Sequence, residues 1–192
     1  MEQALLMGLG LAGPAGLNAY IPLLTLALAD RITDRITLTG PFASLSSTPV
    51  ILLLVILLTI EIVVDKVPGA DHVNDLIQTF IRPAAGAILM VATTTSFVDL
   101  SPVLMAIVGI LAAGTVHAAK ATSRPAVTVG TGGVFNPLVS MGEDMLATVM
   151  SVTAIFLPFL AVIFLIILVA VAVWMFRKAK SAIRKTTSRP PL

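Results

Sequence analysis

Two carboxylates near the end of an apolar run are the first residues in this chain that could do chemistry. Glu61 and Asp65 stand four residues apart, after a stretch made almost entirely of Leu, Ile and Val. That spacing places both side chains on one face of a helix. A charged side chain at the centre of a membrane helix costs about 2.5 to 3.5 kcal/mol, so each acid needs a partner, an ion or a proton. The pair predicts an ion- or proton-binding position; the alternative is that Asp65 and Lys66 only mark the membrane interface.

A second pair of acids lies inside a later apolar segment that opens at Pro137. Glu143 and Asp144 are about 10 Å along that helix, and adjacent side chains on a helix point about 100° apart. One acid can therefore face a cavity while the other pairs with a cation. Structural ion pairing, which locks helices together without transporting anything, is the alternative.

The candidate cationic partners of these acids follow the same two regions of the chain. They are Lys66, Arg82, Lys120 and Arg124. His117 shares a helix face with Lys120, and the ordinary pKa of histidine lies near neutrality, so His117 is a candidate proton relay. A histidine satisfied at the interface is the competing interpretation.

Metal, nucleotide and catalytic chemistry find little support. Asp71 and His72 offer metal-binding atoms, but adjacent side chains point apart on a helix, so no metal or cofactor is predicted. The run 128–136 is rich in Gly and Thr but lacks the Lys-Ser/Thr ending of a phosphate loop; a helix entry that could bind an anion is the better interpretation. No cysteine and no nucleophile motif is present, so we expect no enzyme.

The remaining polar candidates lie at helix starts or breaks. Asn18 and Tyr20 precede Pro22, where they can satisfy a broken helix, and Asn136 and Ser140 open the later acidic segment. All of these positions are interpreted as parts of a substrate- or ion-binding site.

Composition identifies the setting as a membrane. The chain has 192 residues, of which 57% are hydrophobic and 11% charged, and its mean hydropathy is +1.03. Such a chain is an integral membrane protein whose first partners are lipids. Half of the Lys and Arg residues lie in the C-terminal segment 177–192, which favours a membrane-flanking cluster and not nucleic acid binding.

The elements that must position these residues are predicted to form an all-α polytopic bundle. Residues 1–180 form a single transmembrane domain, and 181–192 are expected to be a disordered cytoplasmic tail. We expect about six spans, with a short amphipathic helix at 71–81. The first span is expected to be broken or re-entrant because its first half is rich in Gly and Pro. The spans are 3–29, 50–67, 83–98, 103–120, 137–157 and 159–176.

The two acidic regions share the same spacing between a lysine and a proline. Lys66 and Pro83 are 17 positions apart, as are Lys120 and Pro137. An internal repeat is one explanation, and chance in an apolar chain is the other. A repeat predicts that 61–83 and 117–144 form the two walls of one composite site.

These segments carry a resemblance. Gly16-Leu-Asn-Ala-Tyr-Ile-Pro22, Asp65-Lys-Val-Pro68, Thr79-Phe-Ile-Arg-Pro83 and His117-Ala-Ala-Lys120 resemble motifs of an uncharacterised bacterial inner-membrane family, the domain of unknown function 4126. The resemblance covers nearly the whole chain and implies the bacterial inner membrane, but no activity or substrate. A weaker likeness links the chain to the DedA family of lipid and ion carriers, because Arg82-Pro-Ala-Ala-Gly86 is similar to a shortened form of its motif.

Broken helices and paired acids at one depth are typical of a transporter or channel-like permease for an ion or a small polar or anionic solute. The alternatives are a lipid scramblase or flippase, and a non-catalytic assembly protein. The small residues over 84–92 would suit contacts in a homo-oligomer. The distribution of Lys and Arg predicts a cytoplasmic C-terminus.

Overall fold

The computed structural model describes residues 2–65, 70–94 and 100–187, and leaves some side chains within the helices undescribed, among them those of Asp71 and His72. No strand occurs in these ranges, so the all-α prediction is confirmed. The elements are α1 (Glu2–Ala15), α2 (Tyr20–Ile32), the 3-10 helix η1 (Gly40–Ser46), α3 (Thr48–Val64), α4 (Ala70–Thr94), α5 (Pro102–Thr131), α6 (Asn136–Phe156) and α7 (Pro158–Thr187).

Several of these helices are long and apolar enough to cross a membrane. They are Leu76–Thr94, Pro102–Arg124 and Asn136–Phe156, and η1 with α3 makes a fourth span if this pair, bent by 64°, counts as one. The apolar part of α7, Pro158–Val171, is shorter. By this measure the described part of the chain contains three or four spans, not the six expected, but it remains a membrane-embedded protein.

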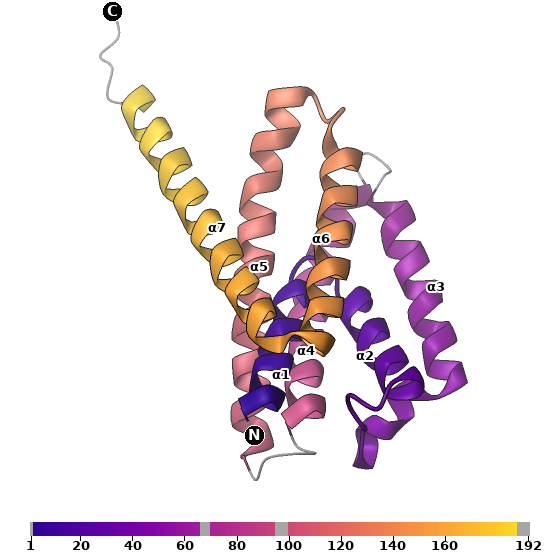
Figure 1. Cartoon of the computed structure of the whole chain (residues 1–192). Coiled ribbons are helices and arrows are strands. Elements are labelled where there is room, and N and C mark those ends of the chain that lie inside the picture. Colours follow the sequence, from indigo (N-terminus) through magenta and orange to yellow (C-terminus); the bar gives the residue numbers. More distant parts are fainter. Residues whose placement is uncertain (1, 66–69, 95–99, 188–192) are drawn as a thin grey trace, which may run out of the picture.

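The first segment is a helical hairpin (Figure 1). α1 runs from the N-terminus toward the middle of the molecule, the chain reverses at residues 16–19, and α2 runs back toward the same end. A regular helix was not expected through the first half, yet α1 is helical up to Ala15 and includes Pro14. Its small residues are buried against other helices, and this packing outweighs their low helix propensity. Pro22 lies in the first turn of α2, where its missing N–H needs no partner.

Helix α4 corrects a predicted boundary. A short helix over 71–81 and a separate span opening at Pro83 were expected, but α4 continues without interruption from Ala70 to Thr94. A proline inside a helix costs about 3 kcal/mol. Extensive packing against α5 compensates for that local cost.

Helix α5 is also longer than expected. The fourth span was predicted to end at Lys120, but α5 continues to Thr131 and is closed by Gly132, whose φ of 59° is left-handed. Only glycine adopts that conformation at little cost, so the helix ends there. The predicted flexible run at 128–136 is therefore the last turn of α5 followed by a tight turn into α6.

Helices α4 and α5 approach each other closely at two glycines. A Cβ atom on Gly109 would collide with the carbonyl oxygen of Gly86, and a Cβ on Gly86 would lie 2.5 Å from the carbonyl oxygen of Gly109. Absence of side chains lets the two backbones touch, which is the usual way helices pack tightly in membranes.

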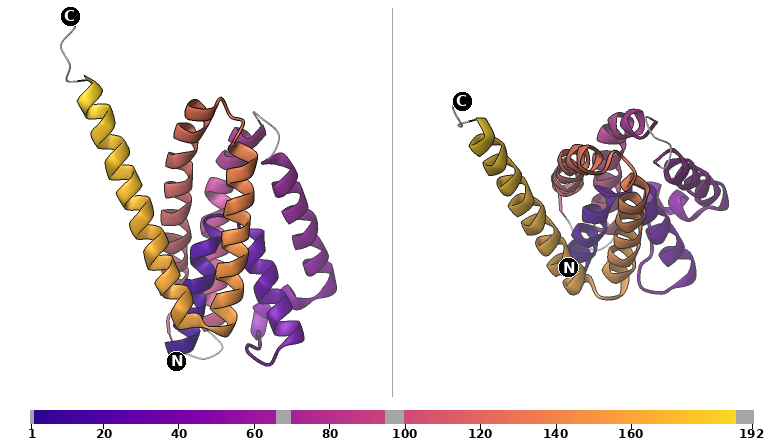
Figure 2. Two further views of the ribbon diagram at one scale, coloured as in Figure 1. Left: turned by 45° about the horizontal axis from the view of Figure 1, so that its top comes forward. Right: turned by 90° about the horizontal axis from the view of Figure 1, so that it is seen from above.

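The outer helices present apolar side chains outward. Large exposed hydrophobic residues follow α3 and α7, including Leu52, Ile56, Ile60, Ile166 and Trp174. α7 leans away from α5 and α6 toward its C-terminal end (Figure 2) and is helical to Thr187, past the predicted start of the disordered tail. Pro190 and Pro191 lie outside the described residues. Exposed apolar faces of this kind suit contact with lipid.

Candidate functional site

A chain of buried polar contacts begins at Glu61. Arg82 donates from Nη2 to Glu61 Oε1 at 3.0 Å, and its Nη1 lies 2.9 Å from Nδ1 of His117. A guanidinium can only donate, so Nδ1 accepts and the imidazole is neutral, with its proton on Nε2. Nε2 lies 3.1 Å from the hydroxyl of Thr79, to which it donates. Glu61, Arg82 and His117 are all buried, so three helices share one continuous hydrogen-bonded path.

A second cluster surrounds Asp65, the residue that follows α3. Its Oδ2 accepts from Arg124 at 3.2 Å and from Ser140 at 3.1 Å, with Lys120 Nζ at 3.9 Å. Lys120 and Arg124 each reach Glu143 Oε2 at 2.9 Å. These contacts connect the end of α3 to α5 and α6. Removing one partner from a buried pair is costly, so the cluster fixes the relative positions of these elements.

The charges around Asp65 determine its protonation. Burial alone raises the pKa of this carboxyl, but Lys120, Arg124 and the hydrogen bonds from Asn74 and Ser140 outweigh burial and hold the pKa below its ordinary value. Asp65 is therefore ionised at neutral pH and serves as the anionic centre of this cluster.

The break between α1 and α2 joins the same region. Asn18 Oδ1 accepts from the backbone N–H groups of Tyr20 and Ile21 and so caps α2. Its Nδ2 donates to Asp144 Oδ1 at 2.9 Å. Lys120 donates to the carbonyl oxygen of Leu17 at 2.8 Å. Both sides of the break are thus bound to α5 and α6.

Two buried acceptors have no donor. Glu61 Oε2 and Gln78 Oε1 have no hydrogen-bond partner among the described residues. Gln78 lies one turn before Arg82 on α4 and is 2% exposed. The side chain of Tyr20 interacts with that of Gln78 and lies in the electrostatic field of Glu61 and Arg82. An unpaired buried acceptor costs about 1 to 3 kcal/mol, so an additional donor at these two oxygens would stabilise the site.

The structure brings most of the predicted residues together. The first cluster consists of Glu61, Arg82 and His117. The second cluster consists of Asp65, Lys120, Arg124, Ser140 and Glu143. Asn18 and Asp144 form the contact between the hairpin and α6. The described parts of 61–83 thus lie beside 117–144, as the composite-site hypothesis required.

Other predicted residues lie elsewhere or cannot be placed. Asn136 exchanges hydrogen bonds with Thr128 at the α5–α6 turn, next to the second cluster but outside its ion pairs. Lys66 and the side chains of Asp71 and His72 lie outside the described residues. Within the described part of the chain, no group of three or more His, Cys, Asp or Glu side chains could hold a metal ion.

Three residues that contribute to the polar contacts were not predicted from the sequence. They are Asn74, Gln78 and Thr79. Gln78 and Thr79 lie four and three positions before Arg82, which puts all three on one face of α4. That spacing could have predicted that Gln78 and Thr79 lie beside Arg82. We did not predict this because we expected the helix to end before Pro83, and residues on two separate helices would not share a face.

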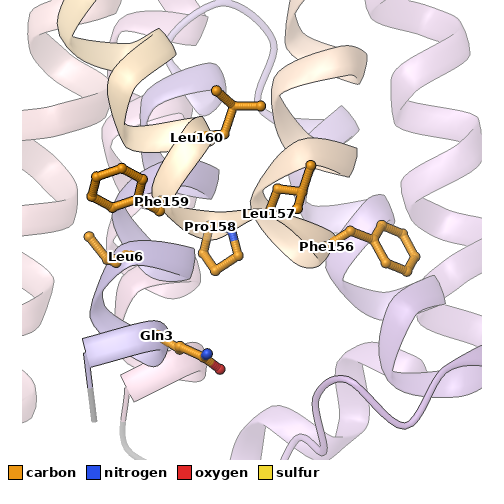
Figure 3. A pocket seen from close by; sticks show the side chains of 7 residues that line it. All are labelled: Gln3, Leu6, Phe156, Leu157, Pro158, Phe159 and Leu160. Carbon is orange, nitrogen blue, oxygen red and sulfur yellow. The ribbon is translucent and has the colours of Figure 1, made fainter.

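A surface pocket exists at the opposite end of α6. It is lined by Gln3, Leu6 and the residues 156–160 that join α6 to α7 (Figure 3). Phe156 is 13 residues beyond Glu143, or about 20 Å along the helix. The lining is almost wholly apolar, so this pocket is separate from the ionised clusters.

Comparison with known proteins identifies a family for this chain. No curated protein and no solved structure matches the chain. The likeness to the DedA family stays a prediction. A family model does match residues 5–178, which is nearly the entire length and includes every residue of both clusters. The chain belongs to the family described as Domain of unknown function (DUF4126).

Proposed function

We propose that this protein is a transporter or channel-like permease that moves an ion or a small polar or anionic solute through the clustered site. The observation that carries the proposal is the pair of donorless acceptors, Glu61 Oε2 and Gln78 Oε1, buried beside a network of ion pairs. A purely structural lock would be expected to satisfy every buried polar atom, because each unmet one weakens it.

The balance of charge supports the same conclusion. Among the side chains that the structure describes, the site contains four carboxyl groups, of Glu61, Asp65, Glu143 and Asp144, and three cationic groups, of Arg82, Lys120 and Arg124. His117 adds no charge in its neutral form. Ionisable groups inside membrane helices are rare and mark ion and solute pathways. A site with one surplus acid has room for one more positive charge.

The broken first segment completes the proposal. Half-length helices that meet near the middle of a membrane are the usual binding element of transporters. α1 and α2 reverse at residues 16–19, and Lys120 and Asp144 bind the two sides of that reversal. We infer a re-entrant hairpin followed by five spans in the bacterial inner membrane, with the basic C-terminus in the cytoplasm.

In this arrangement the N-terminus lies on the outer side. Arg31 and Arg35 then lie outside as well, while residues 177–192 place half of all Lys and Arg residues on the cytoplasmic side. An internal repeat relating 61–83 to 117–144 stays a prediction within this proposal.

An assembly role is the second candidate, and one observation favours it. Lys120, Arg124, Asp65 and Glu143 form closed ion pairs between the end of α3, α5 and α6, as a structural clamp would. Lipid scrambling has weaker support, because Arg82, Lys120 and Arg124 are bound to carboxylates instead of lining an opening toward lipid.

Reconstitution separates these roles. Purified protein in liposomes is exposed to gradients of potassium chloride, sodium acetate, sodium phosphate or glycine, and light scattering follows the volume change. We expect the protein to accelerate at least one solute about tenfold over empty liposomes and Glu143→Gln to slow it. Gly130→Ala, at a position with open space around it, is the matched control and keeps the wild-type rate.

Folded protein that accelerates none of these solutes would reject the permease proposal. A dithionite assay on the same liposomes, carrying a fluorescent lipid, measures scrambling directly. Lipid exchange without solute movement would establish the lipid-handling alternative.

A further inference from the structure

We propose that Glu61 is a proton-binding site in which Oε2 takes up the proton and donates it in a hydrogen bond to Oε1 of Gln78. Glu61 and Gln78 are each 2% exposed, and each has one oxygen without a donor. One proton placed between two acceptors converts two unmet atoms into one hydrogen bond. The two unpartnered oxygens therefore point to a proton as the ligand of this site.

Shared neighbours place the side chains of Glu61 and Gln78 in one region of the site. Arg82 Nη2 binds Glu61 Oε1 at 3.0 Å, which leaves Oε2 as the oxygen available to a proton. Gln78 precedes Arg82 by one helical turn, so both side chains leave α4 on the same face. Tyr20 on α2 interacts with Gln78 and with Glu61, which shows that the two side chains share one neighbourhood.

A proton fits this position better than other ligands. An anion is excluded because both open atoms are acceptors. A metal cation would gain few oxygens and would lie beside the Arg82 guanidinium, which repels it. A proton needs one oxygen to carry it and one to accept from it. Hydronium supplies it and leaves as water, so the step involves no redox partner.

The surrounding charged groups leave Glu61 as the acceptor of that proton. Arg82 on α4 and Lys120 on α5 are cations already, and Asp65 beyond the end of α3 receives several donors. His117 on α5 uses its Nδ1 lone pair to accept from Arg82, so it has no free position for a proton. Tyr20 on α2 is neutral and faces Gln78. Protonation of Glu61 also leaves three carboxylates and three cations among the described side chains of the site.

Binding of the proton does not depend on transport, whereas coupling of the proton to solute movement rests on the proposed function. The probe is therefore the proton alone. Infrared difference spectra of the reconstituted full chain, recorded between pH 5 and pH 9, report protonated carboxylic acids through their C=O stretch, which moves in heavy water.

We expect one such band in the wild type that is lost in Glu61→Gln and kept in Glu143→Gln. Gln78→Met, which removes the accepting oxygen at similar volume, should move the band without abolishing it. Glu61→Gln should fold, because its amide oxygen still accepts from Arg82 and its amide nitrogen can donate to Gln78. Glu61→Asp is the second variant and should shift the band.

An unchanged spectrum in Glu61→Gln and Glu61→Asp would overturn the proton site. A Glu61 band in protein that moves no solute would keep the proton site and reject the permease. Solute flux without a Glu61 band would keep the permease proposal and reject the proton site. Melting curves and gel filtration of each variant confirm that the spectra come from folded protein.

Discussion

Lys120 Nζ donates a 2.8 Å hydrogen bond to the carbonyl oxygen of Leu17, a residue 103 positions earlier in the chain. Leu17 lies in the break between α1 and α2, where carbonyl groups lose their helical partners. The same ammonium group binds Glu143 at 2.9 Å. One side chain therefore satisfies a helix break and an acid on a third helix at once.

Replacing the Lys120 ammonium group should destabilise the folded protein. Lys120→Met leaves the Leu17 carbonyl and one side of Glu143 without their buried donor, and the loss should be about 3 to 5 kcal/mol in the free energy of unfolding. Denaturant titration in detergent measures it. The double variant Lys120→Met/Glu143→Gln should recover part of that loss, because the uncompensated carboxylate is gone. Strictly additive losses would show that the pair is not coupled.

Exchanging Asn18 and Asp144 tests the hairpin contact. Asn18→Asp keeps a good helix cap but brings two carboxylates into hydrogen-bonding distance, so stability should fall by about 1 to 3 kcal/mol. The swap Asn18→Asp/Asp144→Asn restores one donor and one acceptor and should recover most of the loss. Thermal unfolding of the wild type and these two variants decides this, and a swap as unstable as the single variant would contradict the contact.

The glycine contact between α4 and α5 predicts a size limit. Gly109→Ala forces a methyl group against the Gly86 carbonyl, and overpacking of this kind costs about 1 to 3 kcal/mol. Gly130→Ala on the same helix has no atom within 4 Å of the new methyl group and should be neutral or stabilising by up to about 1 kcal/mol. Equal melting temperatures for the two variants would rule out this packing.

Asp65 predicts a pH dependence. Its pKa is lowered in the folded protein, so its contribution to stability is present above the unfolded value of about 3.9 and is lost as the pH falls through the folded value. Wild type should exceed Asp65→Asn in stability most clearly at neutral pH, with the difference shrinking below about pH 4. Asp34→Asn, at an exposed position, is the control substitution. A difference that stays constant down to pH 3 would exclude the ionic role.

Much of the site followed from residue types. Acids and cations in apolar segments must find one another, because lipid offers no solvation. That requirement alone pointed to Glu61, Arg82, Lys120 and Glu143, which the structure places in adjoining clusters. The equal Lys-to-Pro spacing pointed to the same two segments.

Helix boundaries were harder to predict because their decisive contacts are remote in sequence. Pro83 looked like the start of a span, but the packing of α4 on α5 carries the helix through it. Lys120 looked like the end of one, but α5 extends to Thr131. Gln78 was missed for the same reason. Local propensity governs such positions only when tertiary packing is weak.

The hairpin also constrains how the protein is made. α1 contacts α4, α5, α6 and α7, and the ligands of its far end are Lys120 and Asp144. These partners leave the ribosome long after the hairpin does. The hairpin is synthesised before these partners, so it can complete its contacts only after the later helices have entered the membrane.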